Sequence, residues 1–313
     1  MYSSRISDNM NAVTLTADME AESVRLAAVK MSQWNLLTHA GFVTYPHKDA
    51  NGVCTWIYAH QGVKVWGILR PTYTSEHNSK EDLFKVHEAM IKPPGDFSWG
   101  DQSQMYTIFL AAGDLLYVSL SFNSLLKSWH QGLSIMPPGT WHVVYTATPS
   151  YVSGGHFYTY ETLHLTEFSR SFDHLPDGEF ATNANNNVLW VLCRMAMALH
   201  MLQGTHGTLI RHPSHPFSNW NGPFIELYKK PLVALAKMIL DHEHYDPAGY
   251  PVPTIEGTEL RDLQLSKGIM RNFLEAISKA DPNAVQLQYG KDWALIGETL
   301  DRKIKVKKYK KPQ

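Results

Sequence analysis

The sequence is poor in cysteine, in net charge and in long apolar runs, and each shortage excludes a class of protein. Two cysteines among 313 residues cannot build a disulfide framework or a thiolate zinc cage, and they suit a reducing compartment. The formal net charge of -1 excludes polyanion binding through bulk charge, so any nucleic-acid contact must come from a local patch. With 44% hydrophobic residues, the chain can bury a sizeable core in one or two domains, which excludes global disorder.

Signals for membrane insertion and secretion are also lacking. The longest apolar candidate, residues 188–202, is interrupted by Arg194 and His200, so it is too short to span a bilayer and indicates a buried helix. The first residues contain no apolar segment of the kind that a secretory signal needs. We therefore expect no membrane association and a location in the nucleus or, failing that, the cytoplasm.

Changes in residue composition along the chain divide it into four expected regions. Residues 1–40 are an N-terminal helical segment, because strong helix formers dominate from Asp18 to Leu37. Residues 41–182 are β-rich, with a polar insertion carrying a short helix at 74–101. Residues 183–300, after an asparagine-rich loop at 183–187, form a helical C-terminal region, and residues 301–313 are a basic tail. The β-rich region predicts an antiparallel sandwich or barrel. Strands are expected at 54–58, 63–69, 114–120, 142–146 and 156–160, and the later helices at about 188–203, 224–243 and 259–280.

The strongest chemical signal is a His-x-Asp pair at His47 and Asp49. In an extended strand, residues two apart point to the same face, so this imidazole and this carboxylate can converge on one point. They would supply two of the three ligands of a 2-His-1-carboxylate iron site, which leaves positions open on Fe(II). The pair alone carries little weight, because a chain with 16 histidines readily produces one by chance.

A second His-x-Asp pair, His244 and Asp246, ends a predicted helix just before Pro247. Residues two apart on a helix diverge by roughly 200°, and no histidine follows this pair in the chain. We interpret it as a solvated helix end.

Two further residues support the first pair. A Pro-Pro-Gly turn leads into the strand that begins near His142, so His142 can face His47 as a third ligand. Taken alone, His142 fits a core histidine bonded to a backbone carbonyl better. Lys64 lies inside the apolar string Val-Lys-Val-Trp, and a buried ammonium needs a carboxylate partner. A bound dicarboxylate such as 2-oxoglutarate would supply one. The alternative is an edge-strand lysine that reaches solvent.

In combination, these motifs resemble the Jumonji C family of Fe(II)/2-oxoglutarate oxygenases over about residues 35–170, most closely its histone lysine demethylases. The shared pattern is Thr-x-x-His-x-Asp, a lysine 17 positions after the histidine, Pro-Pro-Gly-x-Trp-His and Gly-Gly-x-Phe. The resemblance implies a double-stranded β-helix, the cupin-like jelly roll, so the expected fold class is mainly β with helices. It also implies roles for particular residues: His47, Asp49 and His142 as iron ligands, Thr44 and Lys64 as ligands of 2-oxoglutarate, and Trp56 and Gly154-Gly155 as family positions.

The chain departs from the family pattern at two positions. His156 stands where the family often has asparagine, so it is either a fourth metal ligand or a hydrogen-bonding neighbour of the centre. Ile57 replaces a tyrosine near the cosubstrate. Within the shared pattern, Thr44 and His47 are an odd number of residues apart, so both can face inward only if the strand is irregular, which Pro46 favours.

The resemblance implies a dioxygenase that uses Fe(II) and 2-oxoglutarate to hydroxylate a C–H bond. The leading expectation is demethylation of N-methyl lysine in a protein such as a histone tail, with release of formaldehyde, succinate and CO₂. The alternatives are a protein or small-molecule hydroxylase of the same chemistry, and a catalytically inactive cupin-like binding protein. The segment 302–311 holds seven cations in ten residues, which predicts a weak nucleic-acid contact or a nuclear address, or else a solvated helix end.

Overall fold

The computed structural model describes residues 33–91, 103–114, 136–173, 181–182, 188–202, 220, 223–245 and 257–289. In this described part of the chain, eight strands form two sheets, and five α-helices accompany them. The fold is therefore mainly β with helices, as the sequence predicts.

Each sheet is built largely from antiparallel pairs. The three-stranded sheet has the order β1-β7-β3, from β1 (Gln33–Thr38), β7 (Ser150–Phe157) and β3 (Cys54–Gln61). The five-stranded sheet has the order β5-β4-β6-β2-β8, from β5 (Ser103–Ala111), β4 (Val63–Pro71), β6 (Trp141–Thr146), β2 (Val43–Asp49) and β8 (Ala181–Thr182). β8 pairs with β2 in parallel. Consecutive strands β1 to β4 thus alternate between the two sheets.

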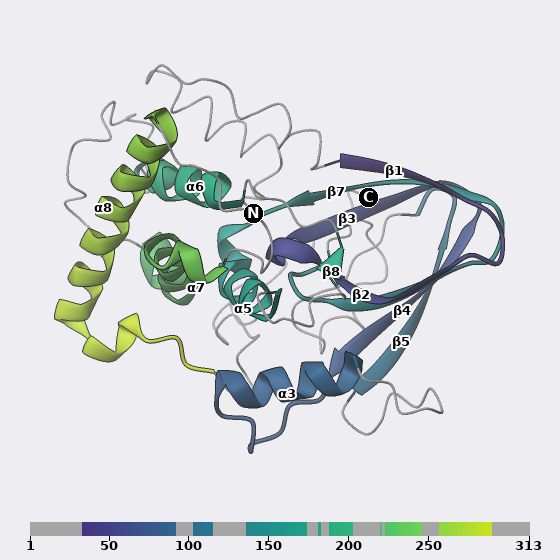
Figure 1. Ribbon diagram of the computed structural model, residues 1–313, viewed down its shortest axis with the longest axis horizontal. Coiled ribbons are helices and arrows are strands. Elements are labelled where there is room, and N and C mark those ends of the chain that lie inside the picture. Colours follow the sequence, from purple (N-terminus) through teal and green to yellow (C-terminus); the bar gives the residue numbers. More distant parts are fainter. Residues whose placement is uncertain are drawn as a thin grey trace, which may run out of the picture.

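The two sheets lie opposite each other and converge at one end of the molecule (Figure 1). A shared core joins them, because apolar side chains from both sheets pack into one cluster: Ile57, Ala59, Val152, Trp66, Ile68, Leu110, Met136 and Val144. Alternate residues of a strand point to opposite faces, so the intervening positions face away from this core.

The helices lie mainly at the end of the molecule where the sheets diverge (Figure 1). They are α3 (Lys80–Ile91), α5 (Leu163–Asp173), α6 (Val188–Leu202), α7 (Pro223–Leu240) and α8 (Gly257–Ala280). α6, α7 and α8 share a second apolar core with Leu163 of α5. The three helices predicted after residue 183 are confirmed, and so is the short helix within 74–101, which is α3. No described helix is long and apolar enough to cross a membrane.

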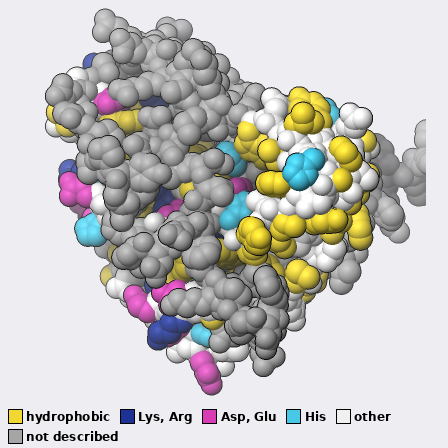
Figure 2. Space-filling model, turned by 45° about the vertical axis from the view of Figure 1, so that its right-hand side comes forward, with side chains coloured by type: hydrophobic (Ala, Val, Ile, Leu, Met, Phe, Trp, Pro, Cys, Tyr) yellow, Lys and Arg dark blue, Asp and Glu magenta, His cyan; other side chains and the backbone are white. Residues whose placement is uncertain are grey.

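Several hydrophobic side chains remain on the outer faces of the strands. Figure 2 shows them gathered on the right-hand part of the surface. The most exposed are Leu37, Tyr45 and Phe109. The pairing register aligns Phe109 with Val65, Val65 with Tyr145, and Tyr145 with Val43, so an apolar row crosses the outer face of the five-stranded sheet.

The predicted N-terminal helix is wrong at its C-terminal end. Residues 33–38 form β1, which pairs with β7 along its whole length. Tertiary pairing outweighs the helix-forming composition of this segment. The backbone of β1 pairs with β7, and Trp34 covers Gly154 of that strand. The boundary at residue 40 is therefore misplaced, because β1 belongs to the sheet region.

Other sequence predictions meet the structure in part. The strand expected at 156–160 ends at Phe157, and a 3-10 helix, η2 (Tyr160–Thr162), follows. β5 was not predicted as a strand. The strand expected at 114–120 lies outside the described residues except for Asp114, and so do the loop at 183–187, the tail at 301–313 and residues 1–32. The roles expected for the basic tail stay predictions.

Candidate metal centre

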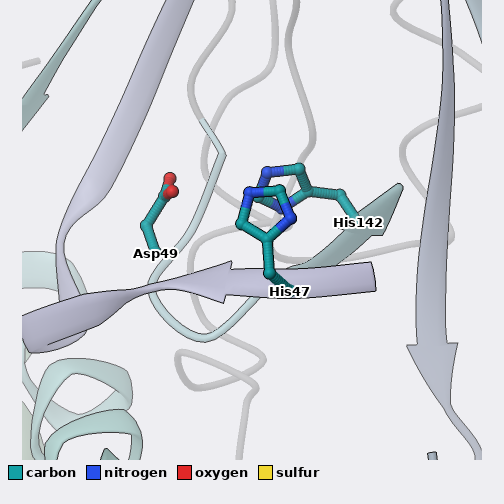
Figure 3. A group of neighbouring side chains, drawn as sticks. All are labelled: His47, Asp49 and His142. Carbon is teal, nitrogen blue, oxygen red and sulfur yellow. The ribbon is translucent and has the colours of Figure 1, made fainter. Parts of the chain in front are cut away.

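His47, Asp49 and His142 come together at one point between the two sheets. His47 and Asp49 lie on β2, and His142 lies on the neighbouring strand β6, directly across from His47. Each residue offers one ligand atom, and the three atoms lie within 4.8 Å of one another. The two imidazole rings are 4.2 Å apart between centroids, with the Asp49 carboxylate to one side (Figure 3). The predicted convergence is confirmed.

A bulge in β2 makes this arrangement possible. Thr44 pairs with Val144 and His47 pairs with His142, so three steps along β2 match two steps along β6. Directly paired residues share a face, and Val144 and His142 are two apart on one strand. Thr44 and His47 therefore both face inward. The irregularity predicted at Pro46 is confirmed, since this proline lies inside the shifted segment.

Both histidines are oriented by a hydrogen bond from Nδ1 to a backbone carbonyl. Nδ1 of His47 donates a hydrogen bond to the backbone carbonyl of Tyr45 at 2.8 Å, and Nδ1 of His142 donates to the carbonyl of Thr140 at 3.0 Å. A carbonyl can only accept, so each Nδ1 carries the proton. Nε2 is then the nitrogen of each ring that is left to face an ion, the usual arrangement at protein metal sites.

The carboxyl group of Asp49 is ionised. Burial alone would raise its pKa, but the nearby imidazoles of His142 and His156 and a hydrogen bond from Thr55 lower the pKa below its ordinary value. The hydroxyl of Thr55 donates that bond to Oδ2 of Asp49. Asp49 thus presents an anionic oxygen ligand.

His142 is neutral, as a metal ligand must be. It is 3% exposed, and burial lowers its pKa to about 4, against the opposing effect of the Asp49 charge. The indole ring of Trp66 stacks on the imidazole at 5.2 Å between centroids. This stacking fixes the plane of the ring on the side away from His47.

The residue between the two β2 ligands anchors the strand on α5. Lys48 points to the opposite face, where its buried ammonium pairs with Asp173 and donates to the carbonyl and hydroxyl of Ser169. Asp173 also accepts a bond from the backbone N–H of Asn51, which has a left-handed φ of 65°. Gly52 follows with φ of 62°, and a Cβ there would meet the Thr166 carbonyl at 2.5 Å. These contacts fix the chain directly after Asp49.

Lys64 is buried on an inner strand of the five-stranded sheet. Its strand, β4, lies between β5 and β6, and the side chain is 1% exposed, so the edge-strand alternative is excluded. The ammonium donates to the hydroxyls of Thr38 at 2.9 Å and Thr146 at 3.0 Å. Among the described residues no carboxylate pairs with it, and burial lowers its pKa. In the part of the chain that the structure describes, one of its three N–H donors is left for a ligand.

Trp66 carries a second donor without an acceptor. It is 5% exposed, and its indole N–H has no hydrogen-bond partner in the described part of the chain. The register places Lys64, Trp66 and Ile68 on the same face of β4, with Ile68 opposite His142. Trp66 therefore lies between Lys64 and the row of residues that contains the metal ligands. Along the strand, these two rows are about 13 Å apart.

The remaining predicted residues occupy different positions. Thr44 faces the same inter-sheet space, one row from Lys64, but the hydroxyls that contact Lys64 are those of Thr38 and Thr146. His156 is outside the group of ligand atoms and instead bonds to Thr55 through Nδ1 at 2.9 Å. His244 lies in a 3-10 helix, η3 (His242–Tyr245), and Asp246 lies outside the described residues.

Sequence reasoning missed four residues that complete the site. Thr38 and Thr146 hold Lys64, Thr55 holds Asp49, and Asp173 holds Lys48. Threonine inside a strand is ordinary, so local pattern gave no signal for the first three. The charge of Lys48, between two ligands in a strand, was the one available sign that a buried carboxylate must lie behind it.

The residues present fit a divalent transition metal with open coordination positions. Two imidazoles and one carboxylate on one side of an ion form the donor set typical of non-haem Fe(II) sites. The structure thus supports a metal site, and the identity of the metal belongs to the proposal below.

Comparisons with known proteins add little to this picture. No protein-family model matches the chain, and no curated protein matches it. Among solved structures, the chain is similar to Peruvianin-I, a cysteine peptidase from Thevetia peruviana latex, at 14% identity and a TM-score of 0.21. That similarity covers 40% of this chain and 47% of the peptidase, and it is too weak to bear on fold or function.

Proposed function

We propose that the protein is an Fe(II)- and 2-oxoglutarate-dependent dioxygenase of the Jumonji C type. The observation that carries the proposal is that a His-Asp-His group and a buried lysine, which has no carboxylate partner among the described residues, face the same space from one sheet. Such a lysine is costly unless an anion binds it. A dicarboxylate that reaches from Lys64 to the ion satisfies both features.

The arrangement of the strands supports the finer fold assignment. Strands β1 to β4 alternate between two facing sheets, and the site lies in the space between them, as in a double-stranded β-helix. We therefore include the cupin-like jelly roll in the proposal.

Each residue has a defined task in the proposed reaction. His47, Asp49 and His142 hold the iron, which when bound supplies the oxygen-activating chemistry that the protein cannot. Lys64 binds the distal carboxylate of 2-oxoglutarate, with Thr38 and Thr146 fixing the ammonium and Thr44 one row away. The indole N–H of Trp66 is placed to donate to an oxygen of the same ligand. Ile57, Val144 and Leu110 exclude water around it.

For the substrate, we propose an N-methyl lysine of a protein such as a histone tail. The support is the sequence resemblance to the demethylase branch, which is an argument by analogy. Hydroxylation of an N-methyl group gives a carbinolamine that releases formaldehyde, so that product distinguishes demethylation from hydroxylation of another C–H bond. A nuclear location is part of this proposal.

The test is succinate production from 2-oxoglutarate, with and without Fe(II), in the presence of a panel of methylated peptides. We expect iron-dependent succinate and, with the right peptide, formaldehyde. His142→Ala should abolish both, whereas His244→Ala, which removes an exposed histidine from η3, should leave both unchanged. Succinate without formaldehyde would indicate a hydroxylase. No iron-dependent succinate from the wild-type protein would contradict the proposal and favour an inactive binding protein.

A further inference from the structure

We propose that Thr55 and His156 form a hydrogen-bond relay that orients Asp49 so that it binds the metal through one carboxylate oxygen. This inference rests on the proposed metal centre and concerns positioning residues that do not touch the ion. It assigns a role to the histidine that departs from the family pattern and to a threonine that sequence reasoning missed.

The direction of the relay follows from its donors. The Thr55 hydroxyl has one hydrogen, and it donates that hydrogen to Oδ2 of Asp49. The same oxygen of Thr55 must then accept from Nδ1 of His156, 2.9 Å away. Nδ1 of His156 therefore carries its proton, and the relay runs from His156 through Thr55 to Asp49.

The pairing of the strands builds the relay into the fold. Thr55 on β3 and His156 on β7 are direct cross-strand partners in the three-stranded sheet, whereas all three metal ligands come from the five-stranded sheet. Thr55 is 2% exposed, so water does not compete for its hydroxyl. On the other side of His156, the ring of Trp34 on β1 lies at 6.4 Å between centroids. Through this relay, the three-stranded sheet thus contacts a ligand of the metal centre.

The consequence concerns the number of open positions on the ion. Because Thr55 donates to Oδ2, Oδ1 is the stronger ligand atom of Asp49, and the hydrogen bond disfavours binding of the metal through both oxygens. One-oxygen binding leaves an additional position for exogenous ligands. Partners of this kind that orient metal ligands are typically worth a factor of about 10–100 in metal affinity.

The test is a titration of the metal-free protein with Co(II), an optical probe of the iron site, in the absence of 2-oxoglutarate. Thr55→Val removes the hydroxyl at nearly constant shape and should weaken Co(II) binding by about 10–100-fold and change the visible absorption bands of the bound ion. Thr55→Ser keeps the hydroxyl and should restore both. Thr162→Val is the matched control, because it removes another buried threonine hydroxyl, whose contacts are Cys54 and Thr159.

A second pair of variants keeps the test decisive if Thr55→Val fails to fold. His156→Leu removes the donor to Thr55, whereas His156→Asn keeps an N–H near the position of Nδ1. We expect weaker binding and altered bands for the leucine variant and near wild-type behaviour for the asparagine variant. Wild-type affinity and spectra in Thr55→Val or His156→Leu would overturn the relay. Tight Co(II) binding by a wild-type protein that makes no succinate would contradict the proposed function and not the relay.

Discussion

At the scale of single residues, the charge of Lys64 is the feature that most needs a ligand. The side chain lies within the shared core of the two sheets, and its hydrogen-bond partners are two uncharged hydroxyls. An ammonium in such surroundings costs stability in the absence of an anion. The protein thus carries an electrostatic cost that the proposed cosubstrate would relieve.

The variant Lys64→Met, which keeps most of the volume and removes the charge, separates these effects. We expect loss of detectable 2-oxoglutarate binding, unchanged Co(II) affinity, and a free energy of unfolding that is unchanged or up to about 3 kcal/mol higher without ligand. Calorimetric titration with each ligand and urea denaturation measure the three quantities. Equal loss of metal and 2-oxoglutarate binding would show that Lys64 is structural.

The pKa of Lys64 gives the sign of the accompanying pH effect. Burial lowers the pKa from its ordinary value of 10.5, so the folded protein binds this proton less tightly than the unfolded chain does. The resulting cost is fully present at pH values below the lowered pKa. It fades as the pH rises from the lowered pKa toward 10.5, provided that no anion is bound.

At the scale of elements, β1 depends on a close fit between an aromatic ring and a glycine. Trp34 lies across β7 at Gly154, where an added Cβ would stand 2.2 Å from the indole ring. The same tryptophan flanks His156. Placement of β1 therefore affects both sheet pairing and the surroundings of the relay.

Gly154→Ala should destabilise the protein by about 1–3 kcal/mol, because the ring or the strand must move to admit the methyl group. Gly268→Ala in α8 is the matched control. A Cβ at Gly268 would meet no atom within 4 Å, so that change should stabilise the protein by up to about 1 kcal/mol through helix propensity. Thermal and urea denaturation measure both. Two equal shifts would contradict the packing argument for Trp34.

At the scale of the whole molecule, buried neutral histidines link folding stability to pH. His87 on α3 accepts a bond from the indole N–H of Trp141 and bonds to the Tyr73 hydroxyl, each at 2.7 Å. Burial and the charge of Lys48 lower its pKa from 6.5 to about 3. The contacts tie α3 to the strand that carries His142.

The pH dependence of unfolding tests this linkage. Between pH 6.5 and about 3 the unfolded chain binds a proton at His87 that the folded protein does not. The free energy of unfolding should therefore fall with decreasing pH over that range, by at most about 1.4 kcal/mol per pH unit from this residue. His87→Gln, which keeps an acceptor and a donor, should show a shallower slope. Urea denaturation at several pH values between about 4.5 and 7 measures it, and equal slopes would contradict the assignment.

Sequence by itself determined the features that depend on residue type and short spacing. The two metal ligands on β2 are two apart, so an extended backbone places them on one face whatever the rest of the fold does. The three segments predicted as helices after residue 183 likewise form α6, α7 and α8. Pro46 in β2 predicted the bulge, because proline has no backbone N–H to donate to a regular strand ladder.

Only the tertiary structure decided which residues from distant strands meet. The register of β3 against β7 brings Thr55 to His156, and the neighbourhood of β1 gives Lys64 its Thr38 partner. Composition favoured a helix at 33–38, yet pairing with β7 made it a strand. The physical reason is that strand pairing is set by long-range hydrogen bonds and burial, and neither leaves a trace in the local spacing of residues.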